Sequence, residues 1–551
     1  MGDVFEGYKD SPVGAAAGRA ADEMLDDTGV PRPEWAALFE TLREFPATEL
    51  RARADQLAST FLDRGVTFDY AGEERPFPLD VVPRIIEAQQ WARVERGVAQ
   101  RVRVLEAFLA DVYGPMRAVA DGVIPRKVIT SSSHFHRAAV GVEPAGGVRI
   151  HVAGIDLVRD EQGDFRVLED NVRVPSGVSY VLENRQAITQ VLPEALQAHR
   201  VQPVAEYPQN LLAALRAAAP AGVDDPTGVV LTPGVYNSAY FEHSLLARAM
   251  GVELVEGRDL VCRGNRLFMR TTAGDRRVDV VYRRVDDEFL DPLHFRRDSV
   301  LGAAGILNAA RAGGVSIANA VGNGVADDKL VYTYVPELTK YYLGEELVLG
   351  NVPTYRLEIP SELEEAMDRL EELVVKPVDG SGGKGLVVCP DATTQQVEEL
   401  RTRVLADPRG WIAQPVIALS TVPTLAGTSL RPRHVDLRPF AVNDGQTVRV
   451  LPGGLTRVAL REGSLVVNSS QGGGSKDTWV LAGEGEAFEE AAPHVELFDD
   501  AVPPEEQHHL ADPGPGGSSE QAQQQQQSQQ QSQRGQGPER DRRQAGRRST
   551  C

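Results

Sequence analysis

The chain is poor in cysteine and has no long apolar run. Its 551 residues include only three cysteines, Cys262, Cys389 and Cys551, which are widely separated and form no C-x-x-C pair. We therefore expect neither a disulfide framework nor a cysteine-based zinc site. Nowhere do about 18 apolar residues follow one another, and the acidic N-terminal stretch lacks the apolar core of a signal peptide. These absences predict a reduced, cytoplasmic protein that is neither secreted nor inserted into a membrane.

Basic residues are outnumbered as well. The sequence has 58 Lys and Arg against 79 Asp and Glu, which gives a formal net charge of -21. Proteins held by nucleic-acid phosphates normally present a basic face, so we expect no nucleic-acid binding by the body of this chain, although small anionic ligands are not excluded. With 42% hydrophobic residues, the composition is that of a globular protein with two or three cores.

The coarse pattern of elements indicates an α/β protein. Residues 91–112 have apolar side chains spaced three or four apart, which is typical of an amphipathic helix. Residues 228–234 read as a buried strand that ends in a turn, 240–250 as a helix and 252–255 as a short strand. This succession predicts a βαβ unit.

A hairpin near residue 160 carries the most informative polar side chains. Residues 149–158 and 164–169 are strand-like and are joined by a charged turn with a closing glycine. Asp156 lies on the first strand, and period-two alternation places Glu169 and Asn171 on one face of the second. Two carboxylates and an amide oxygen form a ligand set suited to Mg²⁺, which phosphates usually complete. A solvated strand edge with incidental acids is the alternative.

The stretch VVKPVDGSGGKGLVV, residues 374–388, places a lysine before a glycine-rich loop. Its glycines satisfy G-x-G-x-x-G, but an apolar strand follows where a dinucleotide-binding turn needs a helix. A P-loop is also excluded, because Lys384 is followed by Gly385. What remains is a flap between two strands whose backbone N–H groups can lie over phosphates, with Lys376 supplying charge. An ordinary surface hairpin is the alternative.

Further polar residues lie on strands near the end of the body. Asp436 and Arg438 alternate on one strand face, and Arg457 lies on another strand. Phosphoryl chemistry uses cationic side chains to neutralise phosphate oxygens. Each arginine taken singly is more often a surface or ion-pair residue.

The C-terminal tail differs in composition from the rest. From residue 483 acidic residues dominate as far as His508, and then QAQQQQQSQQQSQRGQG and an arginine-rich stretch supply no large apolar residue. Such composition cannot build a core, so we expect residues 483–551 to be disordered.

Together these motifs resemble the circularly permuted ATP-grasp family, in its bacterial type 2 group, which is distantly similar to glutathionylspermidine synthase. In ATP-grasp ligases of ordinary order, the metal-binding acid and Glu-x-Asn motif come last. Here Asp156 and Glu169-x-Asn171 precede Asp328-Lys329, Lys376-Pro377 and the flap. The resemblance covers about residues 20–481, including EDNVRVPSGVSYVLENR, LTPGVYNSAYFEH, YRRVDDEFLDPL and NGVADDK.

The resemblance implies a role for each motif. It makes Lys329 and Lys376 phosphate-binding lysines, and it places the flap of Gly380, Ser381, Gly382 and Gly383 over the phosphates of ATP. It makes Asp156, Glu169 and Asn171 the Mg²⁺ ligands and puts Gln414 and Pro415 at the adenine hinge. Two departures stand out: the hinge usually carries a glutamate, and Gly154 occupies the place of an arginine in glutathionylspermidine synthase. Residues 175–180 follow the metal motif and either face the reacting carboxylate or form a structural turn.

The expected fold is α/β, a split, circularly permuted ATP-grasp body with an inserted doubly wound α/β domain and a helical N-terminal segment. The expected parts are a helical segment (1–125), the metal-binding strands (126–219), a pre-ATP-grasp-like α/β domain (220–320), the ATP-binding part (321–482) and the tail (483–551).

The resemblance also implies a reaction that uses ATP and Mg²⁺. A carboxylate, of a small molecule or a peptide, attacks the γ-phosphate to give an acyl phosphate, and an amine then displaces phosphate to form an amide. Arg438 and Arg457 are the candidates for stabilising the transferred phosphoryl group. The alternatives are a non-catalytic nucleotide-binding scaffold and a phosphotransferase on the same fold.

Overall fold

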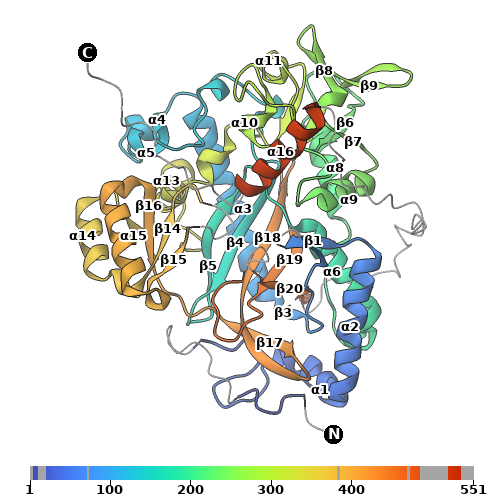
Figure 1. The fold of residues 1–551 in the computed structure, drawn as a ribbon, viewed down its shortest axis with the longest axis vertical. Helices are drawn as coiled ribbons and strands as arrows, with labels where there is room; N and C mark the ends of the chain where they lie inside the picture. The colour runs from blue at the N-terminus through green and yellow to red at the C-terminus, as the bar shows by residue number, and fades with distance from the viewer. Residues whose placement is uncertain are drawn as a thin grey trace.

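An antiparallel sheet runs through the middle of the molecule (Figure 1). The structure, a computed structural model, describes residues 4–9, 20–70, 73–380, 385–467, 472–483 and 519–534. The sheet has the strand order β20-β19-β18-β4-β5, and β17 pairs with β18. Its strands are β4 (Val152–Arg159), β5 (Phe165–Asn171), β17 (Thr421–Ala426), β18 (Ser429–Asn443), β19 (Val448–Val458) and β20 (Gly474–Lys476).

The predicted hairpin is formed by β4 and β5. The two strands pair antiparallel, with Asp156 opposite Glu169 and Gly154 opposite Asn171. Strand β4 is buried along its whole length, because β18 pairs with its other edge. Ile155 belongs to the main apolar core, and the side chains that alternate with it lie on the opposite face of the sheet. The hairpin thus presents Asp156 away from the main core.

Helix α3 (Ala88–Val112) packs on the apolar face of this sheet, which confirms the helix predicted at 91–112. Its buried stripe joins the same core as Ile155, and it also packs against α13 (Val335–Leu343). Arg101 lies on the buried side, where its Nη2 atom is 2.8 Å from Asp170 Oδ2 on β5. This ion pair fixes β5 to the helix.

A four-stranded parallel sheet follows in the chain, in the order β12-β11-β6-β7. Helix α9 (Tyr240–Met250) connects β6 to β7, so the predicted βαβ unit is confirmed. A three-stranded antiparallel sheet, β8 to β10, is inserted before β11. The bounds are β6 (Gly228–Leu231), β7 (Glu253–Val255), β8 (Leu260–Arg263), β9 (Arg266–Thr271), β10 (Gly274–Val278), β11 (Val280–Arg283) and β12 (Ser316–Ala318).

A small sheet with its own apolar core forms a lobe beside the central sheet (Figure 1). Its order is β13-β16-β14-β15, and β14 pairs antiparallel with β15 on the two sides of the glycine-rich loop. The predicted flanking strands are therefore confirmed, while residues 381–384 lie outside the described part of the chain. The elements are β13 (Tyr355–Arg356), α14 (Pro360–Asp368), β14 (Leu373–Pro377), β15 (Val387–Val388), α15 (Thr394–Ala406) and β16 (Trp411–Pro415).

The N-terminal segment packs on the other end of the central sheet. Strand β3 (Arg84–Ile86) pairs in parallel with β21 (Thr478–Val480), so the start of the chain is joined to the end of the body. Helix α2 contacts α6. The remaining elements of the body are α1 (Ala36–Glu44), α2 (Ala47–Asp63), β1 (Thr67–Tyr70), β2 (Glu73–Pro76), α4 (Arg117–Ala120), α5 (Arg126–Thr130), α6 (Val178–Val191), α7 (Pro193–Gln197), α8 (Tyr207–Ala217), α10 (Asp287–Leu290), α11 (Ile306–Arg311) and α12 (Lys329–Tyr332).

The tail differs from its prediction. Residues Ser519–Arg534 form helix α16, which lies across the parallel sheet near α10 and β6 (Figure 1). The expectation of disorder is therefore wrong for these 16 residues, because some of their side chains, among them Ser528 and Gln531, find polar partners on the body. The rest of 484–551 lies outside the described residues.

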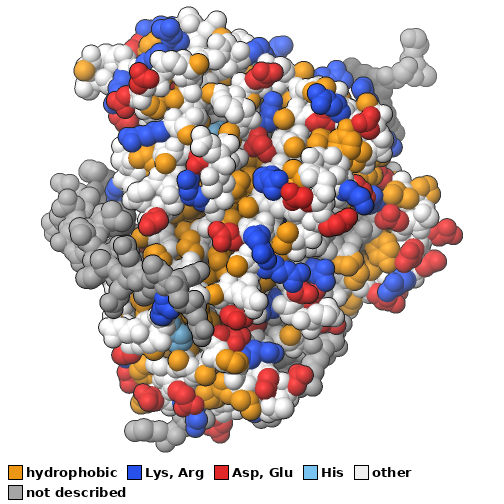
Figure 2. All heavy atoms as spheres, turned by 180° about the vertical axis from the view of Figure 1, so that it is seen from behind, with side chains coloured by type: hydrophobic (Ala, Val, Ile, Leu, Met, Phe, Trp, Pro, Cys, Tyr) orange, Lys and Arg blue, Asp and Glu red, His pale blue; other side chains and the backbone are white. Residues whose placement is uncertain are grey.

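Two surface properties complete the fold. Within the described ranges, no helix has the length and apolar composition needed to cross a bilayer. On the face opposite that of Figure 1, basic and acidic side chains are interspersed, and its visible described part shows no broad basic area (Figure 2).

Candidate active site

A cavity of about 460 Å³ lies between the central sheet and the small sheet. Both sheets and the edge of the parallel domain line it. It gathers the predicted site residues that the structure describes, which are Asp156, Glu169, Asn171, Lys329, Lys376, Gly380, Gln414, Arg438 and Arg457. The other predicted flap residues, Ser381, Gly382 and Gly383, lie outside the described part of the chain.

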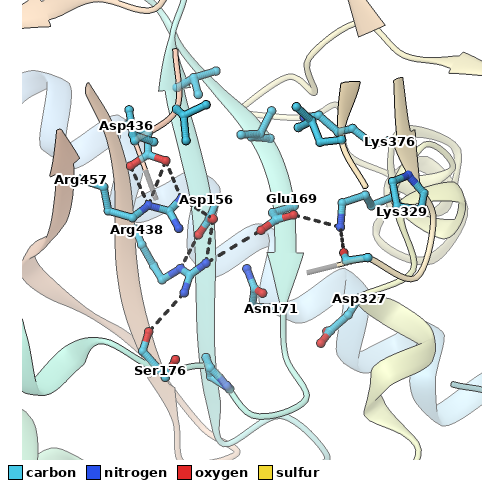
Figure 3. Close-up of a pocket in the computed structure, with 18 of the residues that line it drawn as sticks. Asp156, Glu169, Asn171, Ser176, Asp327, Lys329, Lys376, Asp436, Arg438 and Arg457 are labelled. Atoms are coloured by element: carbon cyan, nitrogen blue, oxygen red, sulfur yellow. Dashed lines mark hydrogen bonds and ion pairs between the residues drawn. The ribbon is translucent and has the colours of Figure 1, made fainter. Parts of the chain in front are cut away.

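The acidic wall of the cavity is the β4–β5 hairpin. Asp156 and Glu169 face each other in register, and Asn171 follows on the same face of β5 (Figure 3). The Nδ2 atom of Asn171 is buried and has no hydrogen-bond partner among the described residues. The hairpin therefore brings the three predicted metal ligands together, as its period-two alternation requires.

Two arginines, one on β18 and one on β19, hold Asp156. Arg438 on β18 pairs with both carboxylate oxygens, and its Nη2 atom is 2.8 Å from Oδ2. The Nη2 atom of Arg457 on β19 is 2.7 Å from the same Oδ2. Burial alone would raise the pKa of Asp156, but the two guanidinium groups outweigh it and hold the pKa below its ordinary value. Asp156 is therefore an anion although only 1% of it is exposed.

Arg457 also serves a second carboxylate. Asp436 is its cross-strand partner, and the Nε atom of Arg457 is 2.9 Å from Asp436 Oδ1. Burial, together with the charge of Asp156, raises the pKa of Asp436 above its ordinary value despite this contact. One guanidinium thus lies between two buried carboxylates.

The side chain of Arg438 occupies the space over Gly154. A Cβ atom at Gly154 would lie 3.3 Å from Arg438 Cδ and 3.2 Å from Pro175 Cβ. Although position 154 carries no arginine, a guanidinium still contacts Asp156, because Arg438 reaches it from β18.

Two lysines form the opposite wall (Figure 3). Lys329 is the first residue of α12, and its Nζ atom lies 3.1 Å from Glu169 Oε2 and donates a hydrogen bond to the Gly380 carbonyl. Lys376 lies on β14, the strand that precedes the glycine-rich loop. Burial lowers the pKa of Lys376 to about 8, since the attraction of Glu169 offsets only part of the desolvation and Lys329 adds repulsion. The acidic and basic walls are thus bridged by the Lys329–Glu169 contact.

Next to these charges the cavity has an apolar end. Val374, Val388, Ile417 and Leu465 line it, together with Gln414 on β16. Gln414 donates a hydrogen bond from Nε2 to Thr354 Oγ1 at 2.9 Å, so its carboxamide is held in place.

Sequence reasoning missed Asp327, which lies beside Asn171 in the cavity (Figure 3). Its Oδ1 atom accepts a hydrogen bond from Val172 N at 2.7 Å, and burial raises the pKa of this carboxyl to about 7. The neighbouring Asp328 instead caps α12 by accepting from Leu330 N, and it pairs with Arg409 at 2.9 Å. The D-D-K run is the signal for an acid here, but it does not tell which aspartate faces the cavity.

The segment after the metal motif serves as both a wall and a turn. Pro175 and Ser176 line the cavity, and the Ser176 carbonyl accepts a hydrogen bond from Arg438 Nη1 at 3.2 Å. Gly177 then adopts φ 111°, which allows the chain to enter α6. The segment therefore forms a turn that also lines the cavity, and its predicted role of facing the reacting carboxylate stays a prediction.

The donor set fits a magnesium ion that phosphates complete. It is all oxygen, with Asn171 contributing Oδ1, and the unpartnered Nδ2 of Asn171 is left to donate a hydrogen bond to a bound ligand. Among the described residues, no three His, Cys, Asp or Glu side chains converge as a ready metal site. Two carboxylates and one amide would therefore form only part of a metal site, which would suit Mg²⁺ because this ion keeps waters and binds substrate phosphates.

Comparison with known proteins shows which family this chain belongs to. Residues 83–459 match the family described as circularly permuted ATP-grasp type 2. The chain belongs to this family. It is 61% identical over 479 residues to an uncharacterized protein of Mycobacterium tuberculosis (strain ATCC 25618 / H37Rv), covering 87% of this chain and 86% of that one. A protein of Synechocystis sp., also uncharacterized, is 51% identical over 470 residues, with 85% and 98% covered.

Two further similarities concern ligases by name. A protein of Frankia casuarinae, provisionally named glutamate–cysteine ligase 2-2, is 48% identical over 469 residues, but these span 83% of this chain and only 53% of that protein. A glutathione synthetase-like effector of Globodera pallida has a similar structure, with a TM-score of 0.51, 12% identity, and coverage of 80% of this chain and 98% of that chain. The latter shows a shared fold, and together with the family it establishes the expected split ATP-grasp architecture.

Proposed function

We propose that this protein is an ATP- and Mg²⁺-dependent carboxylate–amine ligase that acts through an acyl phosphate. The observation that carries the proposal is that Asp156, Glu169 and Asn171 face Lys329 and Lys376 across one cavity (Figure 3). An anionic wall that takes a cation and a cationic wall that takes phosphates are the two halves of a Mg-ATP site.

The nucleotide would extend from the apolar end of the cavity to this pair of walls. Gln414 and the apolar side chains beside it would hold the adenine, and the fixed carboxamide would read the edge of the base. Lys376 and Lys329 would bind the phosphates, with the flap above them. On nucleotide binding, Lys329 would exchange its contact with Glu169 for a phosphate oxygen, which leaves Glu169 available as a ligand.

Asp156, Glu169 and Asn171 would hold the magnesium ion, which supplies charge neutralisation to the phosphate oxygens. Arg438 already donates to Asp156, Arg457 shares that contact, and both line the cavity, so their remaining N–H groups would stabilise the transferred phosphoryl group. Desolvation strengthens these contacts, because the site lies at a buried sheet face.

The reaction proceeds in two displacements. A substrate carboxylate oxygen attacks the γ-phosphorus, the bond to the β–γ bridging oxygen breaks, and ADP leaves. The amine nitrogen then attacks the carbonyl carbon of the acyl phosphate, the C–O bond to phosphate breaks, and the amine proton passes to solvent. The protein mainly positions the reactants, since phosphoryl transfer needs little covalent work from side chains.

The names of relatives support ligation over a scaffold role. The Frankia protein carries a ligase name, although half of it lies outside the match. In this chain both lysines and the three metal-binding candidates line the cavity together. The joint presence of these charges, each of which is costly to desolvate, counts against a scaffold that binds the nucleotide without turning it over.

The test is ADP release with Mg²⁺ and pools of carboxylates and amines, followed by mass spectrometry of the product. We expect an amide product from the wild type and a loss of about a hundredfold or more in turnover for Glu169→Gln. Glu161→Gln is the matched control, because Glu161 lies exposed in the turn of the same hairpin. A phosphorylated hydroxyl product would show a phosphotransferase, and nucleotide binding without ADP release in any pool would show a scaffold.

A further inference from the structure

Helix α16 faces the body with four polar side chains. Gln524, Gln527, Ser528 and Gln531 are spaced at i, i+3, i+4 and i+7, which places them along one side of a helix. Ser528 is 0% exposed, Gln527 1% and Gln531 7%. The buried stripe of this helix is therefore made of carboxamides and a hydroxyl instead of apolar groups.

These side chains bond mainly to backbone groups of the parallel domain. Gln531 donates from Nε2 to the Arg284 carbonyl at 2.8 Å and accepts from Asp286 N at 3.3 Å. Each carboxamide offers a donor and an acceptor, which a carboxylate does not. The other contacts are Ser528 Oγ to Pro233 O, Gln527 Nε2 and Gln523 Nε2 to Asp298 O, Val300 N to Gln527 Oε1, Gln524 Nε2 to Glu256 Oε2, and Arg296 Nη1 to Gln530 Oε1.

The contact surface is the end of the parallel sheet where ligands bind in α/β folds. Pro233 follows the C-terminal end of β6, and Arg284 follows that of β11. In open α/β sheets, ligands bind in the crevice outside the carboxyl ends of the strands. Gln531 itself lines the cavity, on the same wall as Arg284 and Asn237. The helix therefore lies over the wall of the cavity that belongs to the parallel domain.

We propose that this surface is a docking site for a glutamine-rich helix, that α16 occupies it from the same chain, and that the docked helix closes this end of the cavity. The assignment of this end of the cavity as the entrance for the carboxylate or amine rests on the proposed ligase function. The docking of α16 and the closure of the cavity are independent of that function.

The chemistry of the contact makes it releasable. Each hydrogen bond contributes little net free energy in water, and ordering each glutamine side chain costs conformational entropy. No large apolar side chain lies on α16, so the hydrophobic effect adds little. The docked and released states are therefore close in free energy, as a gate requires.

The docking is tested in the full chain with Ser528→Tyr, which forces a large ring into a buried contact with Pro233. The matched control is Gln529→Tyr, because Gln529 is the exposed neighbour. By hydrogen exchange, we expect the amides of Val300 and Asp286, which donate to α16, to exchange about tenfold faster in Ser528→Tyr and unchanged in the control. Equal exchange in wild type and Ser528→Tyr would show that the helix is not docked.

Closure is tested by introducing Asn237→Cys in each background, since Asn237 lines the cavity and is only 8% exposed. The probe is a small methanethiosulfonate reagent, and mass spectrometry reports the modified peptide. We expect Cys labelling at position 237 to be at least about tenfold faster with Ser528→Tyr, while labelling of Cys262 stays constant. Unchanged labelling despite a released helix would overturn the closure. Neither readout requires turnover, so a failure here is distinct from a failure of the ligase function.

Discussion

Arg438 lies over Gly154, and this relationship allows its guanidinium to reach Asp156 from the neighbouring strand. The backbone pairing sets Phe440 opposite Gly154, so Arg438 is two residues along β18 on the same face. Any side chain at position 154 would compete with Arg438 for this space. The glycine is thus needed for room rather than for backbone freedom.

Gly154→Ala is expected to keep the fold and to displace Arg438. The added Cβ would lie 3.3 Å from Arg438 Cδ, which is tight enough to move a long side chain. If Arg438 stabilises the transferred phosphoryl group, ADP release should fall by about tenfold, which corresponds to about 1.4 kcal/mol. Gly228→Ala is the control, because its Cβ would meet open space. Equal rates of ADP release for the two variants would show that Arg438 does not take part in the reaction.

Arg457→Met should destabilise the protein strongly. It leaves Asp156 and Asp436 buried with one guanidinium fewer, and removing a partner from a buried ion pair costs about 3–5 kcal/mol. Urea unfolding would measure this change. Adding Asp436→Asn to Arg457→Met should restore part of the loss, since one uncompensated charge is removed. If the losses of unfolding free energy were additive in the double variant, Arg457 and Asp436 would not be coupled.

Nucleotide affinity should fall as the pH rises through about 8. Burial gives Lys376 a pKa of about 8, so the nucleotide-free chain loses this ammonium charge above that pH. Binding of a non-hydrolysable Mg-ATP analogue, titrated between about pH 7 and about pH 9, should weaken while Lys376→Arg stays flat, because arginine remains protonated. A flat wild-type profile would mean that Lys376 does not contact the phosphates.

Glu23→Gln should destabilise the junction between the N-terminal segment and the central sheet. Glu23 is buried against Arg84, whose Nε atom is 2.9 Å away, and Arg159 at the end of β4. Although burial opposes it, these arginines lower the pKa of Glu23 to about 2. We expect a loss of about 3–5 kcal/mol near neutral pH, measured by urea unfolding, and almost none for the exposed Glu40→Gln.

The pH dependence of this difference has a defined sign. A carboxyl whose folded pKa lies below its unfolded value contributes stability above the unfolded value, and that stability is lost as the pH falls toward the folded pKa. The gap between wild type and Glu23→Gln should therefore narrow as the pH falls from 4.5 toward about 2. A constant gap over this range would show that Glu23 is not held as an anion.

Local patterns were enough to predict the hairpin and its shared face. Alternation at period two places Glu169 and Asn171 together, and the charged turn with Gly163 closes the two strands. The family resemblance also predicted that Lys329 and Lys376 serve one site, and both line the same cavity. These predictions succeed because each depends either on residues that are close in the chain or on the order of motifs in a known family.

The features that were not predicted depend on contacts between residues that are far apart in the sequence. Arg438 meets Asp156 across 282 residues, and nothing near Gly154 indicates it. The sequence does not distinguish Asp327 from Asp328, and only the structure shows that Asp328 caps α12. Helix α16 has no apolar period, and its burial comes from side chains that bond to backbone groups of another domain.

The permuted order also determines when the site can form during translation. Strand β4 is already made when β5 follows it, but its other edge pairs with β18, and Arg438 is 282 residues further along the chain. At about 5–20 residues per second, the ribosome needs roughly 15 to 55 s to reach that point. Until then Asp156 has neither Arg438 nor Arg457 beside it, and the nascent hairpin has an acidic face and an open strand edge. A chain stalled before β18 would carry the complete metal-binding motif and no site.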